Sequence, residues 1–545
     1  MPDRNRTPQT SRRPRRISPV FAVAGAVVAA VLSLALLASP TPAQTPGPPD
    51  TLRIAQIEQV TNFDPALMST QDMGVLIDNV YEGLLGTERD TIRLVPRLAE
   101  KWSFSPDGKT LTFTLRKNVR FHDGTTLDAD AVKFSIDRVK TINKGPAVFI
   151  RGISGVEIAD KSTVRVRISE NPRLALKGLA LIMMVSPTAL KANEEGGDLG
   201  QKWIQRNSVG TGPYKLAEVK PNERQVYTRF DPYWRGWTKG QAARVEYIVQ
   251  LDPAAARLML ERGDVDMTAI YSNDAIEPLR ANPQITVHLK EFPAPQYMMM
   301  NTKVKPLDDV RVRRAIQHAW NRAAWKASLG GVVGEQLAPA PLELLGEDYK
   351  PVTFDYDLAK AKQLLAEAGF PNGGFKITHY YLEGDTHKKS MGELLQAELR
   401  TLGIQMDIRS LIVARMFEMV RDFGKTRNPA SAIDMITLFT PARIFDPHNY
   451  LDWHFNSKAW EYGRNFMYYE NPEVDRLLAQ AAATLDDAQA RPLYRQVADL
   501  VMKDAPTIMI ERLVGKMYTR KNIDGFYFNL KMYPATVVFY DIRKR

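Results

Sequence analysis

One continuous stretch, residues 96–138, limits the folds open to this chain more than any other feature. It reads PRLAEKWSFSPDGKTLTFTLRKNVRFHDGTTLDADAVKFSIDR. Two alternating runs, 102–104 and 111–115, flank the turn Ser105-Pro106-Asp107-Gly108. Proline presets φ for a turn and glycine accepts positive φ, so this segment predicts a β-hairpin. The amphipathic run 129–139, preceded by Thr126 and Asp128, predicts a helix with a short polar residue at its N-cap.

Strand-like and helix-like segments alternate through the rest of the chain. The strand-like runs are 164–168, 225–229, 245–249 and 285–290, and the helix-like runs are 186–194, 254–262, 310–329, 358–368, 388–402, 413–423 and 488–503. Gly369 and Gly403 stand where helix C-caps are expected. This mixing predicts an α/β fold. A chain of 545 residues should form more than one domain, because single cores stop growing near about 250–300 residues.

The first 50 residues have the composition of a targeting segment. Arg12, Arg13, Arg15 and Arg16 precede an apolar run at 20–38 and a proline-rich stretch at 40–49. This order is typical of a secretory signal, so we expect a signal peptide at 1–43, a linker at 44–50 and a periplasmic protein. Two alternatives stay open. About 20 apolar residues can also span a bilayer as an uncleaved anchor, and Ser11-Arg12-Arg13 loosely resembles a twin-arginine signal.

Composition excludes several classes of protein. The chain has no cysteine, which excludes disulfides, thiol catalysis, cysteine-ligated metals and a lipid-modified cysteine anchor. The formal net charge of +11 includes six arginines and one acid within residues 1–43, so the rest of the chain carries +6. That charge is modest, and no basic run resembles a nucleic-acid patch. We therefore expect no nucleic-acid partner.

No catalytic or metal-binding constellation is found. His122-Asp123 could be half of a hydrolase dyad, but it also fits a turn beside the hairpin. Gly210-Thr211-Gly212 lacks the lysine and the spacing of a phosphate loop and is better explained as a tight turn before a strand at 214–216. The seven histidines never form H-E-x-x-H, and the three methionines 298–300 fit an apolar core strand ending at Asn301. Asp357 and the pair Asp486-Asp487 fit helix termini or a solvated surface. We expect no cofactor, no metal and no enzymatic activity.

Seven further motifs accompany the stretch 96–138. In order they are NFDPA (62–66), NVYEGLL (79–85), VGTGPY (209–214), RFDPYWRG (229–236), LERGDVD (260–266), Asn301 with VRVRRAI (310–316), and Tyr356-Asp357 with AEAGF (366–370). Each motif alone is weak. Together, from about residue 51 to the C-terminus, the chain resembles the large extracytoplasmic solute-binding proteins of ABC importers, the family (family 5) that includes the dipeptide- and oligopeptide-binding proteins.

The resemblance implies a periplasmic binding protein-like, two-lobed clamp with an additional domain inserted in the first lobe. In the terms of that family, lobe I comprises 51–85, 205–297 and 511–545, the extra domain comprises 86–204, and lobe III comprises 298–510. The ligand then lies between lobes I and III, which close by a hinge motion.

The resemblance also locates a candidate ligand site. Peptide-binding members hold the ligand's α-ammonium with an aspartate shortly before an Asp-Pro-x-Asn-aromatic segment, which is Asp446-Pro447-His448-Asn449-Tyr450 here. The anchoring position falls at or beside Arg443, and no acid lies between Asp434 and Asp446. Guanidinium repels an ammonium and grips a carboxylate or phosphate with two donors. The arginine that dipeptide binders use for the ligand carboxylate is also missing from 380–385.

The other candidate lining residues come from loops and aromatic side chains around the expected cleft. They are Met68 and Thr70 after the first strand, Tyr380 and Tyr381, Thr440 beside Arg443, and Trp453. Aromatic rings provide large contact areas at low entropic cost, although core packing would explain each of them equally well.

These features predict a monomeric periplasmic protein that captures a small, peptide-like or anionic solute for an ABC importer. Its partners would be the small-molecule ligand and the importer's permease and ATPase subunits. Two alternative functions would use the same clamp. The first is a chaperone or sensor-coupling module without an importer, and the loss of the dipeptide anchors favours it. The second is a hydrolase, and the absence of a nucleophile–base pair argues against it.

Overall fold

The computed structural model describes residues 50–57, 60–68, 72–91, 93–440, 444–530 and 536–545. All of these belong to the unit formed by residues 46–545, and residues 1–45, which contain the whole of the predicted signal peptide, lie outside the described residues.

A ten-stranded mixed sheet forms the frame of the molecule, in the order β14-β13-β15-β12-β16-β11-β1-β10-β9-β8. Its strands are β1 (Thr51–Gln56), β8 (Tyr214–Lys220), β9 (Arg224–Arg229), β10 (Arg244–Val249), β11 (Met267–Thr268), β12 (Ile285–Met300), β13 (Lys376–Leu382), β14 (Gln405–Leu411), β15 (Met435–Phe439) and β16 (Thr507–Arg520). We call the part built on β1 and β8–β11 lobe I, and the part built on β13–β15 lobe III.

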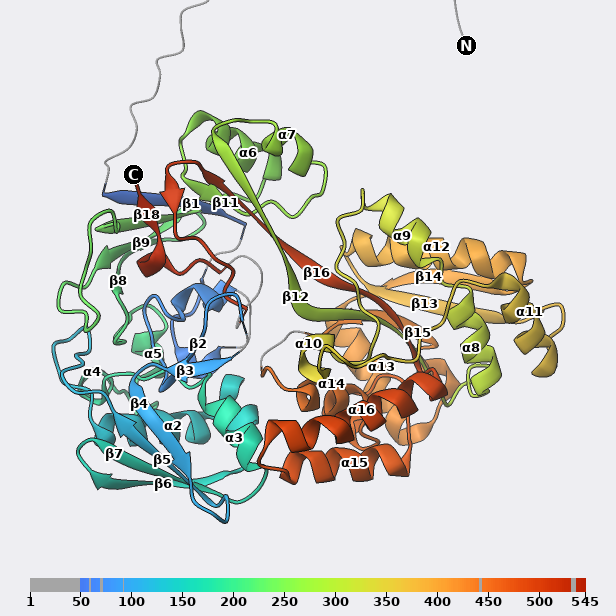
Figure 1. Ribbon diagram of the computed structural model, residues 1–545, viewed down its shortest axis with the longest axis horizontal. Coiled ribbons are helices and arrows are strands. Elements are labelled where there is room, and N and C mark those ends of the chain that lie inside the picture. The colour runs from blue at the N-terminus through green and yellow to red at the C-terminus, as the bar shows by residue number, and fades with distance from the viewer. Residues whose placement is uncertain (1–49, 58–59, 69–71, 92, 441–443, 531–535) are drawn as a thin grey trace, which may run out of the picture. The chain divides into compact units, whose positions relative to one another are not determined.

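Two long antiparallel strands, β12 and β16, run from one lobe into the other (Figure 1). The ladder between them is irregular between Glu291 and Pro295. Pro293 and Pro295 lie in this stretch of β12, and proline cannot donate a ladder hydrogen bond. The two strands are therefore least tightly paired midway between the lobes, where a hinge is expected to bend. Beyond the irregularity, Met298–Met300 are buried in the core, as predicted.

The additional domain is built on a separate antiparallel sheet in the order β4-β5-β7-β6. Its strands are β4 (Ala99–Phe104), β5 (Thr110–Leu115), β6 (Ile153–Asp160) and β7 (Thr163–Ile168), beside the small hairpin β2 (Leu85–Thr87) and β3 (Leu94–Pro96). The predicted hairpin is confirmed: Phe104 pairs with Leu111, and Gly108 has φ +70° in the turn. The helix after it is α2 (Ala129–Ile142), whose N-cap Asp128 accepts a hydrogen bond from the Ala131 amide at 3.0 Å.

The remaining helices cover the three parts. Around lobe I and the additional domain lie α3 (Pro172–Leu179), α4 (Pro187–Ala192), α5 (Gln201–Ile204), α6 (Pro253–Arg262) and α7 (Ile276–Arg280). Lobe III carries α8 (Val310–His318), α9 (Arg322–Ser328), α10 (Leu342–Leu345), α11 (Leu358–Glu367), α12 (Thr386–Thr401), α13 (Val413–Thr426), α14 (Pro447–Phe455), α15 (Pro472–Ala483) and α16 (Asp487–Asp504). Short 3-10 helices occur at Pro65–Leu67, Asp72–Leu76, Gly145–Ile150, Pro429–Ser431, Ala459–Tyr462 and Phe539–Asp541.

Most local predictions agree with these bounds, with one correction. The segment 310–329 forms two helices, α8 and α9, and not one. The break falls at Asn321, whose side chain accepts a hydrogen bond from the Ala324 amide at 2.9 Å and caps α9. Asparagine competes with the helical backbone in this way, which is why it favours caps over helix interiors. Gly369 and Gly403 follow α11 and α12 with positive φ, as predicted for C-caps.

Four sequence motifs meet at one buried carboxylate, Glu82 of the NVYEGLL motif, which has no exposed surface. It accepts hydrogen bonds from Tyr233 (2.9 Å), Trp234 (3.0 Å) and Thr211 (3.1 Å), while the guanidinium of Arg97 lies 4.0 Å away. These partners come from RFDPYWRG, VGTGPY and the stretch 96–138. Burial raises the pKa of Glu82, and Arg97, Trp234 and Tyr233 oppose that rise. These motifs therefore tie the additional domain to lobe I.

A second buried contact supports the same junction. Asp64 of the NFDPA motif receives two hydrogen bonds, each 2.7 Å, from Arg138 at the end of α2, and both side chains are almost completely buried. The motif VGTGPY leads into β8 and packs closely against NVYEGLL, since a Cβ on Gly210 would lie 2.0 Å from the Val80 carbonyl oxygen. His122 is also structural: its Nε2 lies 2.9 Å from the Gly212 carbonyl oxygen.

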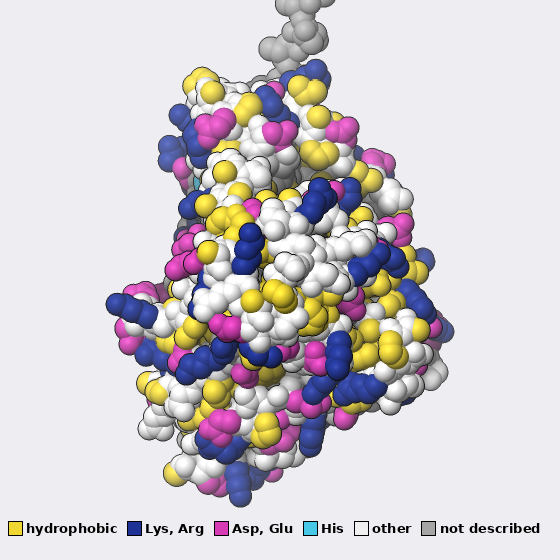
Figure 2. Space-filling model, turned by 90° about the vertical axis from the view of Figure 1, so that its right-hand side faces the viewer, with side chains coloured by type: hydrophobic (Ala, Val, Ile, Leu, Met, Phe, Trp, Pro, Cys, Tyr) yellow, Lys and Arg dark blue, Asp and Glu magenta, His cyan; other side chains and the backbone are white. Residues whose placement is uncertain are grey.

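Charged side chains of both signs are interspersed on the face of lobe III shown in Figure 2. No area of that face is dominated by lysine and arginine. This distribution agrees with the modest charge of +6 outside residues 1–43.

Candidate functional site

A cavity of about 690 Å³ lies between the additional domain and lobe III. The additional domain contributes the β2–β3 hairpin, β4 and α3, and lobe III contributes the starts of α10, α14 and α16. The charged and aromatic side chains of the lining are Glu88, Arg93, Trp102, Phe104, Arg173, Lys177, Glu343, Phe445, Asp486, Asp487, Arg491 and Tyr494. A cavity of this size between two bodies suits a small-molecule ligand.

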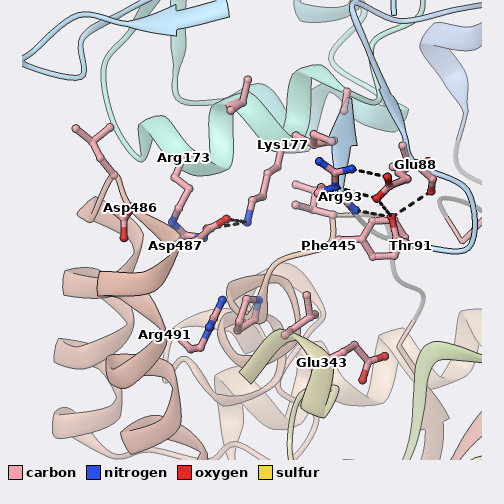
Figure 3. A pocket seen from close by; sticks show the side chains of 18 of the residues that line it. Glu88, Thr91, Arg93, Arg173, Lys177, Glu343, Phe445, Asp486, Asp487 and Arg491 are labelled. Carbon is pink, nitrogen blue, oxygen red and sulfur yellow. Dashed lines mark hydrogen bonds and ion pairs between the residues drawn. The ribbon is translucent and has the colours of Figure 1, made fainter. Parts of the chain in front are cut away.

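Local sequence explains how the walls are placed. Pro172 opens α3, and Gly178 lets that helix pack closely, because a Cβ there would lie 2.1 Å from the Phe149 carbonyl oxygen. On the opposite wall, Asp446 and Asp486 are the N-caps of α14 and α16. The polar starts of two lobe III helices thus face α3 across the cavity, as Figure 3 shows for α16.

Arg173 and Lys177 of α3 reach across to lobe III (Figure 3). The guanidinium of Arg173 pairs with Asp446, lies 3.1 Å from Asp487, and donates to the Tyr494 hydroxyl (2.6 Å). It also donates to the carbonyls of Ala481 and Thr484, both at 3.2 Å. The Arg173 side chain is 3% exposed and that of Asp446 is fully buried, so this pair is shielded from solvent.

Lys177 forms the more accessible half of the same network. Its ammonium lies 2.8 Å from Asp446 and 2.9 Å from Asp487. Burial lowers the pKa of Lys177 and outweighs the opposing effect of Asp487. Burial alone would raise the pKa of Asp487, but Lys177 and Arg173 reverse this, and the net shift is downward. The two groups therefore interact directly, and each appears among the causes of the other's pKa shift.

The other charged residues of the lining are paired, with one exception. Glu88 pairs with Arg93, Glu343 pairs with Arg512 at 2.8 Å, and Asp486 caps α16 by accepting from the Gln489 amide. Arg491, in the second turn of α16, makes no ion pair or hydrogen bond with the described part of the chain, and Figure 3 shows its side chain at the cavity. The Asp348–Arg495 hydrogen bond and the local backbone are the larger causes that lower the pKa of Asp348, and the charge of Arg491 helps to lower it. The cavity therefore presents one cation that makes no direct ion pair or hydrogen bond with the described residues.

Two of the predicted ligand residues, Arg443 and Thr70, lie outside the described residues. Thr440 is described and is 2% exposed. Its amide donates to the Pro295 carbonyl in the hinge region (3.0 Å), and its hydroxyl bonds His454. Met68 is 6% exposed and belongs to the main hydrophobic core. Neither side chain lines the cavity of 690 Å³.

The predicted aromatic residues are spread over lobe III. Tyr380 and Tyr381 are half-buried on β13, away from the lining of the cavity. Burial, together with Asp434, raises the pKa of Tyr380. Trp453 lies on α14 with the guanidinium of Arg464 stacked 3.6 Å from its ring centroid. It lines a smaller cavity of about 310 Å³, also between the additional domain and lobe III. The structure thus brings one described candidate, Trp453, to a cavity between these parts.

Sequence analysis missed the cationic face of α3 and the residue Arg491. Asp486 and Asp487 were predicted only as helix-terminus or surface acids, which is correct for both, but the contacts of Asp487 with α3 were not foreseen. The signal that could have drawn attention to α3 is the i, i+4 pair Arg173 and Lys177 on one helix face. The described residues contain no group of three or more acidic or histidine side chains placed to hold a metal, and no described helix is long and apolar enough to cross a membrane.

The molecule has two lobes joined by the long strands β12 and β16, and a cavity lies between the additional domain and lobe III. This arrangement defines a two-lobed ligand-binding protein. The model of the family described as bacterial extracellular solute-binding proteins, family 5, matches residues 93–462. The chain therefore belongs to the bacterial extracellular solute-binding proteins of family 5.

Named relatives support the same conclusion over most of the chain. It is 27% identical over 511 residues to the "Probable D,D-dipeptide-binding periplasmic protein DdpA" of Escherichia coli, covering 92% of this chain and 95% of the relative. The "Glutathione-binding protein GsiB" of Pectobacterium atrosepticum gives the same identity and coverage. The structure of HbpA2 from Haemophilus parasuis superposes with a TM-score of 0.78 at 24% identity, over 91% of this chain and 100% of that one.

These findings confirm the predicted α/β two-lobed fold and the predicted role as a solute-binding component of an ABC importer. The relatives are binding proteins and not enzymes, and they are periplasmic where their names give a location.

Proposed function

We propose that this protein captures a small peptide-like solute that carries a carboxylate or another anionic group, and delivers it from the periplasm to an ABC permease and its ATPase. The observation that carries the anionic character is Arg491, a charged lining residue that makes no direct ion pair or hydrogen bond with the described residues. A half-buried cation at a cavity favours an anion, because the hydrogen bond between them is charge-assisted.

Two further points support an anionic, peptide-like ligand. Arg443 stands where peptide-binding members keep an aspartate, so the ligand end at that position would carry negative charge. One relative is named for binding glutathione, a tripeptide with two carboxylates and one ammonium. Glutathione and the dipeptide D-alanyl-D-alanine are therefore informative probes, since they differ in net charge.

The proposed organisation follows the same family pattern. Lobe I would comprise 51–85, 205–297 and 511–545, the extra domain 86–204, and lobe III 298–510. The sheet order supports this division, since β1, β8–β11 and part of β16 are neighbours although they are far apart in the chain. The mature protein would begin near residue 43, act as a monomer and carry no lipid anchor, because it has no cysteine.

Native mass spectrometry of the purified protein, followed by calorimetry, tests the ligand class. We expect a co-purified mass that contains a carboxylate or phosphate, and weak binding of D-alanyl-D-alanine. A charged hydrogen bond contributes about 1.5–3 kcal/mol, and truncating one partner can cost more. Arg443→Ala should weaken the identified solute roughly 10- to 1000-fold, and Arg491→Ala roughly 10- to 100-fold.

The matched control is Arg421→Ala, an exposed arginine of α13, which should change affinity by less than about twofold. Tight binding of unmodified D-alanyl-D-alanine, or a co-purified ligand without an anionic group, would show that the charge argument is wrong. Wild-type affinity in Arg443→Ala would show that this arginine does not contact the ligand.

A further inference from the structure

The contacts between α3 and lobe III join two bodies that must separate when the cleft opens. Arg173 and Lys177 belong to the additional domain, while Asp446 and Asp487 begin two helices of lobe III. The partners are roughly 270 to 315 residues apart in sequence, for example 273 for Arg173 and Asp446 and 310 for Lys177 and Asp487. None of these ion pairs can persist if the two bodies move apart.

We propose that these four side chains form an electrostatic latch that stabilises the closed conformation and sets the open-to-closed ratio before any solute binds. This proposal deepens the solute-binding function proposed above. Solute that contacts both walls binds only the closed form, so the apparent affinity depends on how much of the protein is already closed.

The latch has a buried part and an accessible part, and they have different roles. In the closed form Arg173 satisfies its donors with Asp446, Asp487, Tyr494 and two carbonyls, so opening would transfer a fully bonded guanidinium to water. Lys177 is 15% exposed and Asp487 is 56% exposed, so water and salt can reach this pair. The accessible pair is where ionic strength should act on closure.

An apolar contact lies beside the charged pairs. Leu485, just before α16, is 40% exposed and meets the turn of the β4–β5 hairpin: a Cβ built on Gly108 would lie 3.1 Å from a methyl carbon of Leu485. The hairpin tip and α3 therefore both touch the α15–α16 corner. Two separate contacts at one corner restrict the direction in which lobe III can approach, which positions it over the cavity.

The absence of cysteine makes the latch directly measurable, since two introduced cysteines can carry spin labels without background labelling. Ala159 on β6 and Ala479 on α15 are small, exposed and on opposite sides of the latch. Double electron–electron resonance on the full protein without solute measures the distribution of distances between the two spin labels. We expect a short-distance population that shrinks as salt rises from about 50 mM to about 500 mM.

Neutral substitutions then test the pair itself. Lys177→Met and Asp487→Asn should each raise the open-to-closed ratio about 2- to 5-fold at low salt. The double variant should raise it by less than the product of the two single effects, because the partners act through each other. Lys202→Met, which removes an exposed ion pair within the additional domain, is the matched control and should leave the distribution unchanged.

Two results would overturn the latch: a distance distribution that does not respond to salt, or single variants whose distributions match the wild type. Strict multiplicativity in the double variant would also exclude coupling across the cleft. Because no solute is present, these outcomes are independent of the ligand. Failure of the anionic solute to bind would contradict the proposed ligand class and leave the latch standing.

Discussion

Removing the buried carboxylate of Glu82 should destabilise the protein more than any surface substitution. Glu82 accepts three hydrogen bonds, from Tyr233, Trp234 and Thr211, and it has no exposed surface. Each buried donor left without an acceptor costs about 1–3 kcal/mol, and some donors will be rescued by water entering the vacated volume. We therefore expect Glu82→Ala to cost about 4–6 kcal/mol in unfolding free energy.

The companion variant Glu82→Gln separates acceptor loss from charge loss. Glutamine keeps one carbonyl oxygen and removes a buried charge, while Arg97 retains Asp78 at 3.4 Å as a counterion. We expect a cost of about 1–3 kcal/mol. The matched control is Glu218→Ala, since Glu218 is about one-third exposed (34%) and pairs with Lys220 and Arg224 on the surface. This control should cost less than about 1 kcal/mol.

Guanidinium unfolding followed by tryptophan fluorescence and circular dichroism measures these differences, and unchanged m values would show that the same surface is exposed. Several domains can unfold in more than one transition, so the comparison is made on the transition that Glu82→Ala shifts. A cost below about 1 kcal/mol for Glu82→Ala would refute the reasoning. Equal costs for alanine and glutamine would show that charge, and not hydrogen-bond acceptance, holds the motifs together.

Two further predictions concern stability. Asp64→Asn should lower the free energy of unfolding by about 3–5 kcal/mol, because it leaves Arg138 buried without a counter-charge. The control Lys133→Met removes an exposed i, i+4 pair and should cost less than about 0.5 kcal/mol. Equal losses of stability in thermal unfolding would contradict this prediction. Burial lowers the pKa of His379 to about 4 in the folded protein, whereas histidine in the unfolded chain has a pKa of about 6.5. As the pH falls from about 6.5 towards 4, protons therefore bind the unfolded chain more readily, and the free energy of unfolding decreases. His379→Gln should reduce the stability lost between about pH 7 and pH 5 by about 1–2 kcal/mol, and an unchanged pH profile from chemical unfolding would rule this out.

Local features followed directly from sequence because neighbouring residues decide them. The β4–β5 turn, the caps at Asp128 and Asp357, and the glycines after α11 and α12 each depend on the φ preference or the hydrogen bond of one or two residues. Asn321 marks the limit of this approach, since the apolar period of 310–329 favoured one helix while a single capping side chain made it two.

Tertiary structure alone decided which residues meet. The motifs around Glu82 were recognisable in the sequence, but nothing local showed that they share one carboxylate. In the same way, Arg173 and Asp446 come together only because β12 and β16 carry lobe III back against the additional domain. Sequence periodicity reports which face of an element is apolar, whereas ion pairs between residues hundreds of positions apart depend on how the lobes pack. The family and the fold could therefore be predicted from the sequence, whereas the lining of the cavity and the latch could be identified only in the folded protein.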